Sequence, residues 1–262
     1  MYKKYIKISK NSKCWRVNKL KRIDKIISEQ TYYTRSEIKK LISQKKVYAN
    51  EQLVLKSDEK YDETAVVIKI GGKELEIRKQ IYLLLNKPKG YVSTTENGEG
   101  KTVLDLVPEK YKNRNLFPAG RLDKDTTGLM LITDDGEFAH NILAPRKHVK
   151  KTYEVTIDIP VTEEMVKGFA EGIKLKDAEC KPAILEITGE YTAKVTLLEG
   201  RYHQIKRMFG CYAAKVTELN RISMGNLMLP KDIKYGEVRE ATEEELNQIS
   251  ETKEWKSWIE RL

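Results

Sequence analysis

The pattern of apolar positions predicts two short helices near the start of the chain. The first would bury one face formed by Ile23, Ile26 and Ile27, which recur at helical spacing. A second helix is predicted to begin near Thr34, because residues 34–37 (Thr-Arg-Ser-Glu) match a capping box. Its predicted buried positions are Ile38, Leu41 and Ile42. Its predicted outward-facing positions are Arg35, Lys39 and Lys40.

Strand-like segments and further helices are predicted along the rest of the chain. The first strands would lie at residues 47–49, 53–55, 65–70 and 74–78, with Gly71-Gly72 as a turn. Later strands are predicted at residues 81–85, 128–133, 152–157, 183–187 and 192–198. Later helices are predicted at residues 135–143, 162–171 and 203–211. Because these elements do not form a regular βαβ repeat, we predict an α+β fold.

Charge is distributed unevenly along the sequence. The net charge is +10, and residues 1–60 hold 17 Lys or Arg against 6 Asp or Glu, whereas the remainder holds 32 against 33. A concentrated basic module beside a neutral body is typical of a phosphate-binding domain joined to a second domain, although a solvated basic surface is the alternative. We therefore predict a basic extension (1–20), a small phosphate-binding domain (21–78), a larger domain (80–249) and a carboxy-terminal tail (250–262).

Composition narrows the class of protein. The chain has 262 residues, 40% of them apolar and 34% charged, without a long apolar run or a secretory signal at its start. Its cysteines, Cys14, Cys180 and Cys211, show no CxxC spacing, and there are only three histidines. We therefore expect a cytoplasmic protein with reduced thiols, no membrane segment and no metal centre.

The most promising chemistry lies in the loop at residues 119–128 (AGRLDKDTTG), which runs into an apolar strand. It combines two carboxylates, Asp123 and Asp125, with Arg121 and flanking glycines. On local grounds, a catalytic role for Asp123 and a capped turn in which it satisfies backbone groups are equally good interpretations. A glycosidase with paired carboxylates is a third, but two residues of separation do not establish the facing geometry that it needs.

A second polar segment, residues 199–208 (EGRYHQIKRM), follows a predicted strand and begins a predicted helix. Basic side chains near a helix start favour anion binding, because backbone N–H groups also point there. A lone histidine is more often structural than catalytic, so His203 is interpreted as an RNA-contact or structural residue. Tyr153, in KTYEV, alternates with apolar residues, and core packing is its default role.

These motifs carry a family resemblance. GRLDKDTTGL, KTYEV and EGRYHQIKRM, in this order, closely resemble pseudouridine synthases of the RsuA-like branch. LNKPKG at residues 85–90 matches the first motif of that branch, and KPAILEI at 181–187 is similar to its small-subunit enzymes. The segment RIDKIISEQTYYTRSEIKKLISQKKVYANEQLV resembles the S-four RNA-binding domain, except that Glu51 replaces the glycine commonly found after Asn50. The resemblance covers roughly residues 21–249.

The resemblance implies a catalytic domain with a mixed, mainly antiparallel sheet and an isomerase that converts a uridine of ribosomal RNA to pseudouridine. Asp123 would be the essential carboxylate, Lys206 its basic partner, Tyr153 the ring packed on the flipped base and Arg121 the residue that displaces the base. Further RNA-binding candidates are Arg201, His203, Arg207, Arg35, Lys39 and Lys40. No cofactor is expected, since isomerisation neither gains nor loses atoms.

The expected partner is ribosomal RNA or an assembling small ribosomal subunit, bound by a monomer, and the expected substrate is small-subunit (16S) RNA. The target nucleotide would be extruded into a pocket, and Lys206 would favour the ionised form of Asp123. Three alternatives remain: a synthase acting on large-subunit (23S) RNA, a non-catalytic ribosome-assembly protein that binds RNA, and a base-removing glycosylase.

Overall fold

The computed structural model describes residues 20–96, 98, 100–144 and 149–250. The predicted extension, up to residue 19, and the predicted tail, from residue 251, lie outside the described residues. The described chain divides into two compact units, one up to Lys79 and one from Gln80 onward. Among the described residues, no helix is long and apolar enough to cross a membrane.

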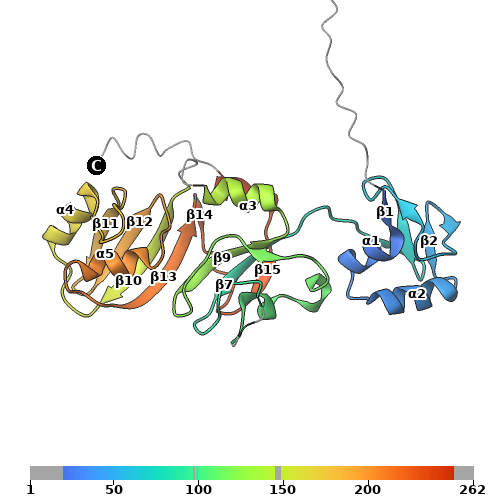
Figure 1. Ribbon diagram of the computed structural model, residues 1–262, viewed down its shortest axis with the longest axis horizontal. Helices are drawn as coiled ribbons and strands as arrows, with labels where there is room; N and C mark the ends of the chain where they lie inside the picture. Colours follow the sequence, from blue (N-terminus) through green and yellow to red (C-terminus); the bar gives the residue numbers. More distant parts are fainter. Residues whose placement is uncertain (1–19, 97, 99, 145–148, 251–262) are drawn as a thin grey trace, which may run out of the picture. The chain divides into compact units, whose positions relative to one another are not determined.

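Unit 1 packs two helices against a small sheet (Figure 1). The helices are α1 (Ile23–Gln30) and α2 (Arg35–Ser43). The sheet has the order β3 (Gln52–Leu53), β2 (Val47–Ala49), β5 (Ile68–Ile70) and β6 (Lys73–Leu75). A separate antiparallel pair joins β1 (Lys21–Arg22) to β4 (Lys60–Tyr61).

The start of α2 follows from its sequence. Thr34 accepts a hydrogen bond from the backbone of Glu37, whose carboxylate accepts one from the backbone of Thr34, so the predicted capping box is confirmed. Ile38 and Ile42 are buried in a core shared with α1, and Leu41 is partly buried. Arg35, Lys39 and Lys40 are exposed, as predicted.

Several strand predictions in unit 1 were wrong in extent. The strand predicted at 53–55 is confined to β3, and Leu55 is 72% exposed. Similarly, the strand predicted at 65–70 is only the three residues of β5, and the one predicted at 74–78 is β6. Short apolar runs resemble strands even where the backbone has no neighbour to pair with.

Unit 2 is built on a nine-stranded sheet with its main path in the order β11-β12-β10-β13-β9-β7-β15. The strands on this path are β11 (Ile184–Gly189), β12 (Thr192–Leu197), β10 (Lys151–Ile157), β13 (Val216–Met224), β9 (Thr127–Thr133), β7 (Tyr82–Lys87) and β15 (Val238–Glu240). β8 (Phe117–Pro118) pairs with β9, and β14 (Leu227–Met228) pairs with β13. Only the pair of β13 with β9 is parallel among the described strands, so the predicted α+β class with a mixed, mainly antiparallel sheet is confirmed.

Apolar cores cover both faces of β7 and β9. Along β9, Met130 and Ile132 join one core, whereas Leu129 and Leu131 join the other. The uninterrupted apolar run of this strand reflects burial on both faces.

Helices complete the two cores of unit 2. The first contains Phe169 of α4 (Glu163–Glu171) and Phe209 of α5 (Gln204–Gly210). The second contains residues of α3 (Gly136–Leu143) and α6 (Glu243–Ser250), including Ile249. Two short 3-10 helices, Val103–Leu106 and Glu109–Tyr111, lie between β7 and β8. Figure 1 shows α4 and α5 beside β10 to β12, and α3 beside β9.

Candidate active site

Asp123 lies in the loop between β8 and β9, and its backbone is fixed on both sides. The backbone N–H of the buried Leu122 donates to Ser93 Oγ at 3.1 Å, and Ser93 Oγ donates to the Leu122 carbonyl at 2.8 Å. On the other side, the N–H of Thr126 donates to the Asp123 carbonyl at 3.1 Å. The Asp123 side chain remains 26% exposed. The loop therefore presents a carboxylate to solvent from a rigid backbone.

The side chain of a buried lysine, Lys87, holds this loop through hydrogen bonds to its carbonyls. Lys87, at the end of β7, is fully buried, and its ammonium donates to the carbonyls of Thr126 at 2.8 Å, Asp123 at 3.0 Å and Pro88 at 3.2 Å. Burial lowers the pKa of Lys87 to about 8, although the charges of Asp125 and Asp123 oppose the shift. Lys87 is therefore a cation whose hydrogen bonds fix the backbone beneath Asp123.

Close packing fixes the point at which the loop enters β9. Gly128 has φ +101° and lies against β13, so that a Cβ atom would stand 2.3 Å from the carbonyl oxygen of Arg221. Arg221 is itself buried, and its Nε donates to the Leu129 carbonyl at 2.7 Å. Only glycine combines this backbone conformation with such an approach. The loop is thus held by β7 and β13 together.

A buried polar network shapes the second predicted segment. Gln204, 4% exposed, donates to Glu199 at 2.8 Å and accepts from the backbone N–H of Arg201 at 2.9 Å. Glu199 also accepts from the backbone of Lys181 at 3.0 Å. His203, at the start of α5, takes the left-handed conformation with φ 49°. This strained turn directs the histidine ring toward Asp123.

The two segments meet at the Asp123 carboxylate. Lys206 Nζ lies 3.2 Å from one oxygen of Asp123, and His203 Nε2 lies 3.3 Å from the other. Lys206 also donates to both oxygens of Asp125, at 2.7 and 2.9 Å. The structure therefore places one ammonium between two carboxylates and a histidine beside the first.

The electrostatics of this group favour its charged forms. Burial alone would lower the pKa of Lys206, but hydrogen bonds and charge from Asp125 and Asp123 outweigh it and raise the pKa. The hydrogen bond from Lys206 lowers the pKa of Asp125 below its usual value. A glycosidase needs one carboxyl group that stays protonated as a general acid, and Asp125 is held in the opposite state. The paired-carboxylate interpretation therefore has no support here.

The predicted RNA-binding residues of unit 2 lie on these same two segments. Arg121 is exposed two residues before Asp123. Arg201 is 42% exposed and pairs with Glu199, with 3.3 Å between Nε and the carboxylate. Arg207 pairs with Asp177, and this contact lowers the pKa of the Asp177 carboxyl. The remaining predicted residues, Arg35, Lys39 and Lys40, belong to α2 of unit 1.

Tyr153 occupies a different environment from Asp123. It lies on β10, is 8% exposed, and pairs across the sheet with Val195 and Arg221. Its ring belongs to the apolar core that also contains Leu122. Core packing, its default role in the sequence, therefore describes its surroundings, and among the described residues no polar contact joins it to Asp123.

Two features of this site were missed in the sequence. Lys87 continues the alternation of Leu83 and Leu85, which predicts the same buried face for all three. A lysine on a buried face was therefore the available signal. His203 was interpreted as an RNA contact or structural residue, and no sequence pattern indicated its left-handed backbone or its approach to Asp123.

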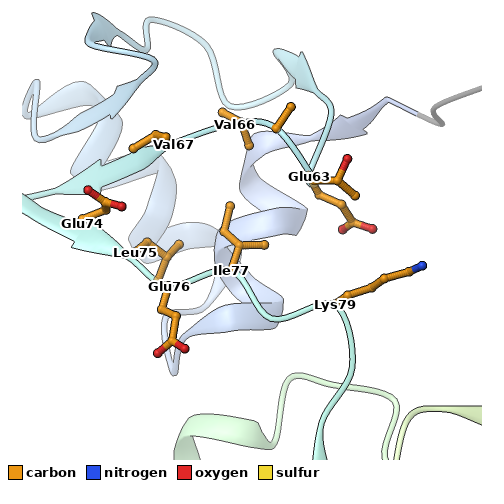
Figure 2. A pocket seen from close by; sticks show the side chains of 10 residues that line it. Glu63, Val66, Val67, Glu74, Leu75, Glu76, Ile77 and Lys79 are labelled. Carbon is orange, nitrogen blue, oxygen red and sulfur yellow. The ribbon is translucent and has the colours of Figure 1, made fainter.

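The described residues hold no group of three or more His, Cys, Asp or Glu side chains suited to a metal ion. A cavity of about 430 Å³ lies in unit 1, and no predicted site residue is among those that line it. Figure 2 shows carboxylates of Glu63, Glu74 and Glu76 around it, with apolar side chains such as Ile77. Carboxylates repel phosphates, so this cavity is a poor RNA site.

Comparison with known proteins agrees with the geometry. The family described as RNA pseudouridylate synthase matches residues 81–210, and the S4 domain matches residues 21–67. An RNA pseudouridine synthase of Bacillus subtilis (strain 168) is 37% identical, over 88% of this chain and 98% of its own. Ribosomal small subunit pseudouridine synthase A of Escherichia coli (strain K12) is 38% identical, over 87% and 99%.

A solved structure extends this likeness to three dimensions. A crystal structure of a pseudouridylate synthase is 38% identical, with a TM-score of 0.62, and the match covers 87% of this chain and 99% of that one. Relatives of this identity, matched over nearly their whole length, share both the S4 domain and the catalytic fold. The chain therefore belongs to the pseudouridine synthases of the RsuA-like branch, isomerases that act on RNA and carry an S4 domain before the catalytic domain.

Proposed function

We propose that this enzyme converts one uridine of small-subunit ribosomal RNA to pseudouridine, with Asp123 as the catalytic carboxylate. The observation that carries the proposal is the Asp123 carboxylate itself, held 3.2 Å from Lys206 on a loop fixed by Lys87. The small-subunit substrate is supported by relatives such as the Escherichia coli protein, whose name specifies it.

The reaction needs a reactive group close to the ribose of an extruded nucleotide. The bond between the ribose and a uracil nitrogen breaks, the base rotates, and a ring carbon forms the new bond to the ribose. That carbon then loses its proton, and the released nitrogen takes one up, so the product is an isomer. Asp123 serves this sequence either by attacking the ribose or by removing a proton from it, and both roles require an ionised carboxylate. The ammonium of Lys206 stabilises that negative charge.

Other residues position the RNA. The family resemblance assigns Tyr153 to pack on the flipped base, through the 8% of its surface that stays exposed, and Arg121 to take the space that the base leaves in the stack. His203 lies beside the carboxylate, and Arg201 and Arg207 lie on the same segment, where the three meet neighbouring phosphates and bases. Removing a base from its stack costs a few kcal/mol. Phosphate contacts from the exposed cations of α2 offset part of this cost.

Mapping pseudouridines in ribosomal RNA tests the proposal directly. We expect cells that lack the protein to lose one pseudouridine of the small-subunit RNA and wild-type protein to restore it. Asp123→Asn should not restore it, whereas Glu186→Gln, an exposed carboxylate on β11, should restore it fully. A pseudouridine restored by Asp123→Asn would refute the assigned catalytic role.

Assays with purified protein separate the remaining alternatives. Wild-type protein and transcribed small-subunit RNA, free or assembled with ribosomal proteins, should yield pseudouridine without release of uracil. Free uracil would indicate a glycosylase, and binding without any conversion would indicate an assembly protein. Conversion of large-subunit RNA alone would move the substrate to that subunit.

A further inference from the structure

Tyr202 is an exposed aromatic residue next to the catalytic carboxylate that the proposed mechanism does not use. Its side chain is among the most exposed large rings of the described chain, at 70%. One face of the ring stacks on the His203 ring, with centroids 3.8 Å apart and planes 20° apart. The high exposure leaves the other face open. The His203 ring in turn lies 3.3 Å from the Asp123 carboxylate. Tyr202 is therefore stacked directly on the ring that contacts this carboxylate.

The turn that carries Tyr202 is rigid. Residues on both sides are fixed by the buried hydrogen bonds of Gln204 to Glu199 and to the backbone of Arg201. The guanidinium of Arg207 donates to the Tyr202 carbonyl at 3.5 Å. An exposed ring on a fixed backbone loses little conformational freedom when a ligand packs on it. Such a ring is therefore suited to binding.

The surroundings indicate which ligand fits. Arg201 and Arg207 place cations on either side of the ring in sequence, and cations interleaved with an exposed aromatic ring are typical of sites for single-stranded RNA. Bases stack on such rings, and successive stacked bases are about 3.4 Å apart along one strand. A base on the open face of Tyr202 would be separated by the tyrosine from the His203 ring, which contacts Asp123, and this position suits a neighbour of the reacting nucleotide.

We propose that Tyr202, backed by His203, is a stacking platform for the base of a nucleotide adjacent to the target uridine. The inference rests on the proposed function, because it assumes that the target ribose reaches Asp123. The platform holds the unpaired neighbour while the target is out of the stack. Tyr202 thereby contributes to substrate selection through the RNA strand that flanks the uridine.

Single-turnover kinetics with the full-length protein test this platform. The substrate is a synthetic small-subunit RNA fragment that contains the uridine mapped above. Tyr202→Ala should reduce kcat/KM by about 10-fold or more, as expected for the loss of one base–aromatic stack. Tyr202→Phe keeps the ring and should stay within about 2-fold of wild type. Tyr191→Ala, an exposed tyrosine at the opposite end of β12, is the matched control and should have no effect.

A double-mutant cycle that combines Tyr202→Ala with abasic RNA fragments identifies the base that stacks on Tyr202. Fragments with an abasic nucleotide immediately before or after the target should react more slowly with wild-type protein, at one of the two positions by about the same factor as Tyr202→Ala. In Tyr202→Ala, that abasic fragment should show no further loss. Additive losses at both positions, or an equal loss in Tyr202→Phe, would overturn the platform while leaving the proposed function intact. Failure of the wild-type protein to convert the unmodified fragment, both free and assembled with ribosomal proteins, would instead refute both.

Discussion

At the scale of single residues, the site depends on cations placed where carboxylates and carbonyls need them. Lys206 could be assigned from the sequence because it stands in a recognisable motif. Lys87 could not, because its role comes from the carbonyls of Asp123, Lys124 and Thr126, which only the folded loop brings to it. The left-handed backbone of His203, beside the buried network of Glu199 and Gln204, is likewise seen only in the folded chain.

Lys87 predicts a pH dependence of turnover. Its pKa of about 8 means that its ammonium loses a proton, and with it one N–H donor, as the pH rises through that value. We expect kcat to fall above pH 8 while KM changes little, because the loop loses its support but RNA contacts remain. Lys206 does not account for this decline, since its pKa is raised. A pH–rate profile from 6.5 to 9.5 is the measurement, and a flat profile above pH 8 would contradict the prediction.

The lowered pKa of Lys87 also predicts that the stability of the protein rises with pH, whereas its turnover falls. The folded-state pKa of Lys87, about 8, lies below the ordinary value of 10.5, so between these values the unfolded chain binds a proton that the folded chain does not. The free energy of unfolding contributed by Lys87 therefore rises with pH across this window. Lys87→Met should be less stable by about 2 kcal/mol at neutral pH, because buried carbonyls lose their donor.

Urea unfolding from pH 7 to 9.5, compared between wild type and Lys87→Met, isolates this contribution. Lys151, buried with a pKa also lowered to about 8, is present in both proteins and cancels. The stability difference between the two proteins should widen as the pH rises. A constant difference would mean that Lys87 does not titrate in this window.

At the scale of elements, local sequence predicted the helices better than the strands. The capping box of α2 marks its start in sequence and in structure, and α4 begins within one residue of the start predicted at residue 162. β13, nine residues long, was not predicted, because its buried face includes Arg221 and Ser223 in place of apolar residues. Its position in the sheet is set by pairing with β10 and β9, which no local pattern reports.

The β2–β3 hairpin carries a correctable strain. Both residues of its turn are left-handed, Asn50 with φ 48° and Glu51 with φ 64°. Two-residue hairpins of this kind favour glycine at the second position, where Glu51 now stands. Glu51→Gly should stabilise unit 1 by about 0.5–1 kcal/mol, even though an exposed ion pair with Lys69 is lost.

Calorimetry of the full chain would detect this gain as a higher transition temperature for unit 1. Glu51→Ala serves as the control, because it removes the same ion pair but keeps a Cβ atom on a left-handed backbone. It should be neutral or slightly destabilising. Equal stabilisation by alanine and glycine would show that charge, rather than backbone strain, is responsible.

At the scale of the whole molecule, charge and chemistry are divided between the two units. The excess of basic residues lies in residues 1–60, whereas Asp123, Lys206 and His203 belong to unit 2. This division could be predicted from composition and motif order. The meeting of two loops some 80 residues apart at one carboxylate could be predicted only through the family resemblance, because no spacing rule brings them together.

Removing residues 1–79 should separate RNA affinity from folding. We expect the shortened chain, beginning at Gln80, to keep its unfolding transition but to bind small-subunit RNA more weakly. Its affinity should also depend less steeply on salt, because fewer phosphates are neutralised. Filter binding across a salt titration measures both effects. If the slope of log affinity against log salt concentration is unchanged, the phosphate contacts belong to unit 2.

The ammonium shared by Asp123 and Asp125 has a practical consequence for capturing the enzyme at work. In Asp123→Asn, Lys206 still holds Asp125 at 2.7 Å, so the mutation leaves no unpaired cation and little reason for the loop to rearrange. The variant should therefore bind RNA in the native arrangement without converting the uridine, and so act as a substrate trap. Such a trap would allow the complex with RNA to be isolated and its structure determined with the uridine still in place.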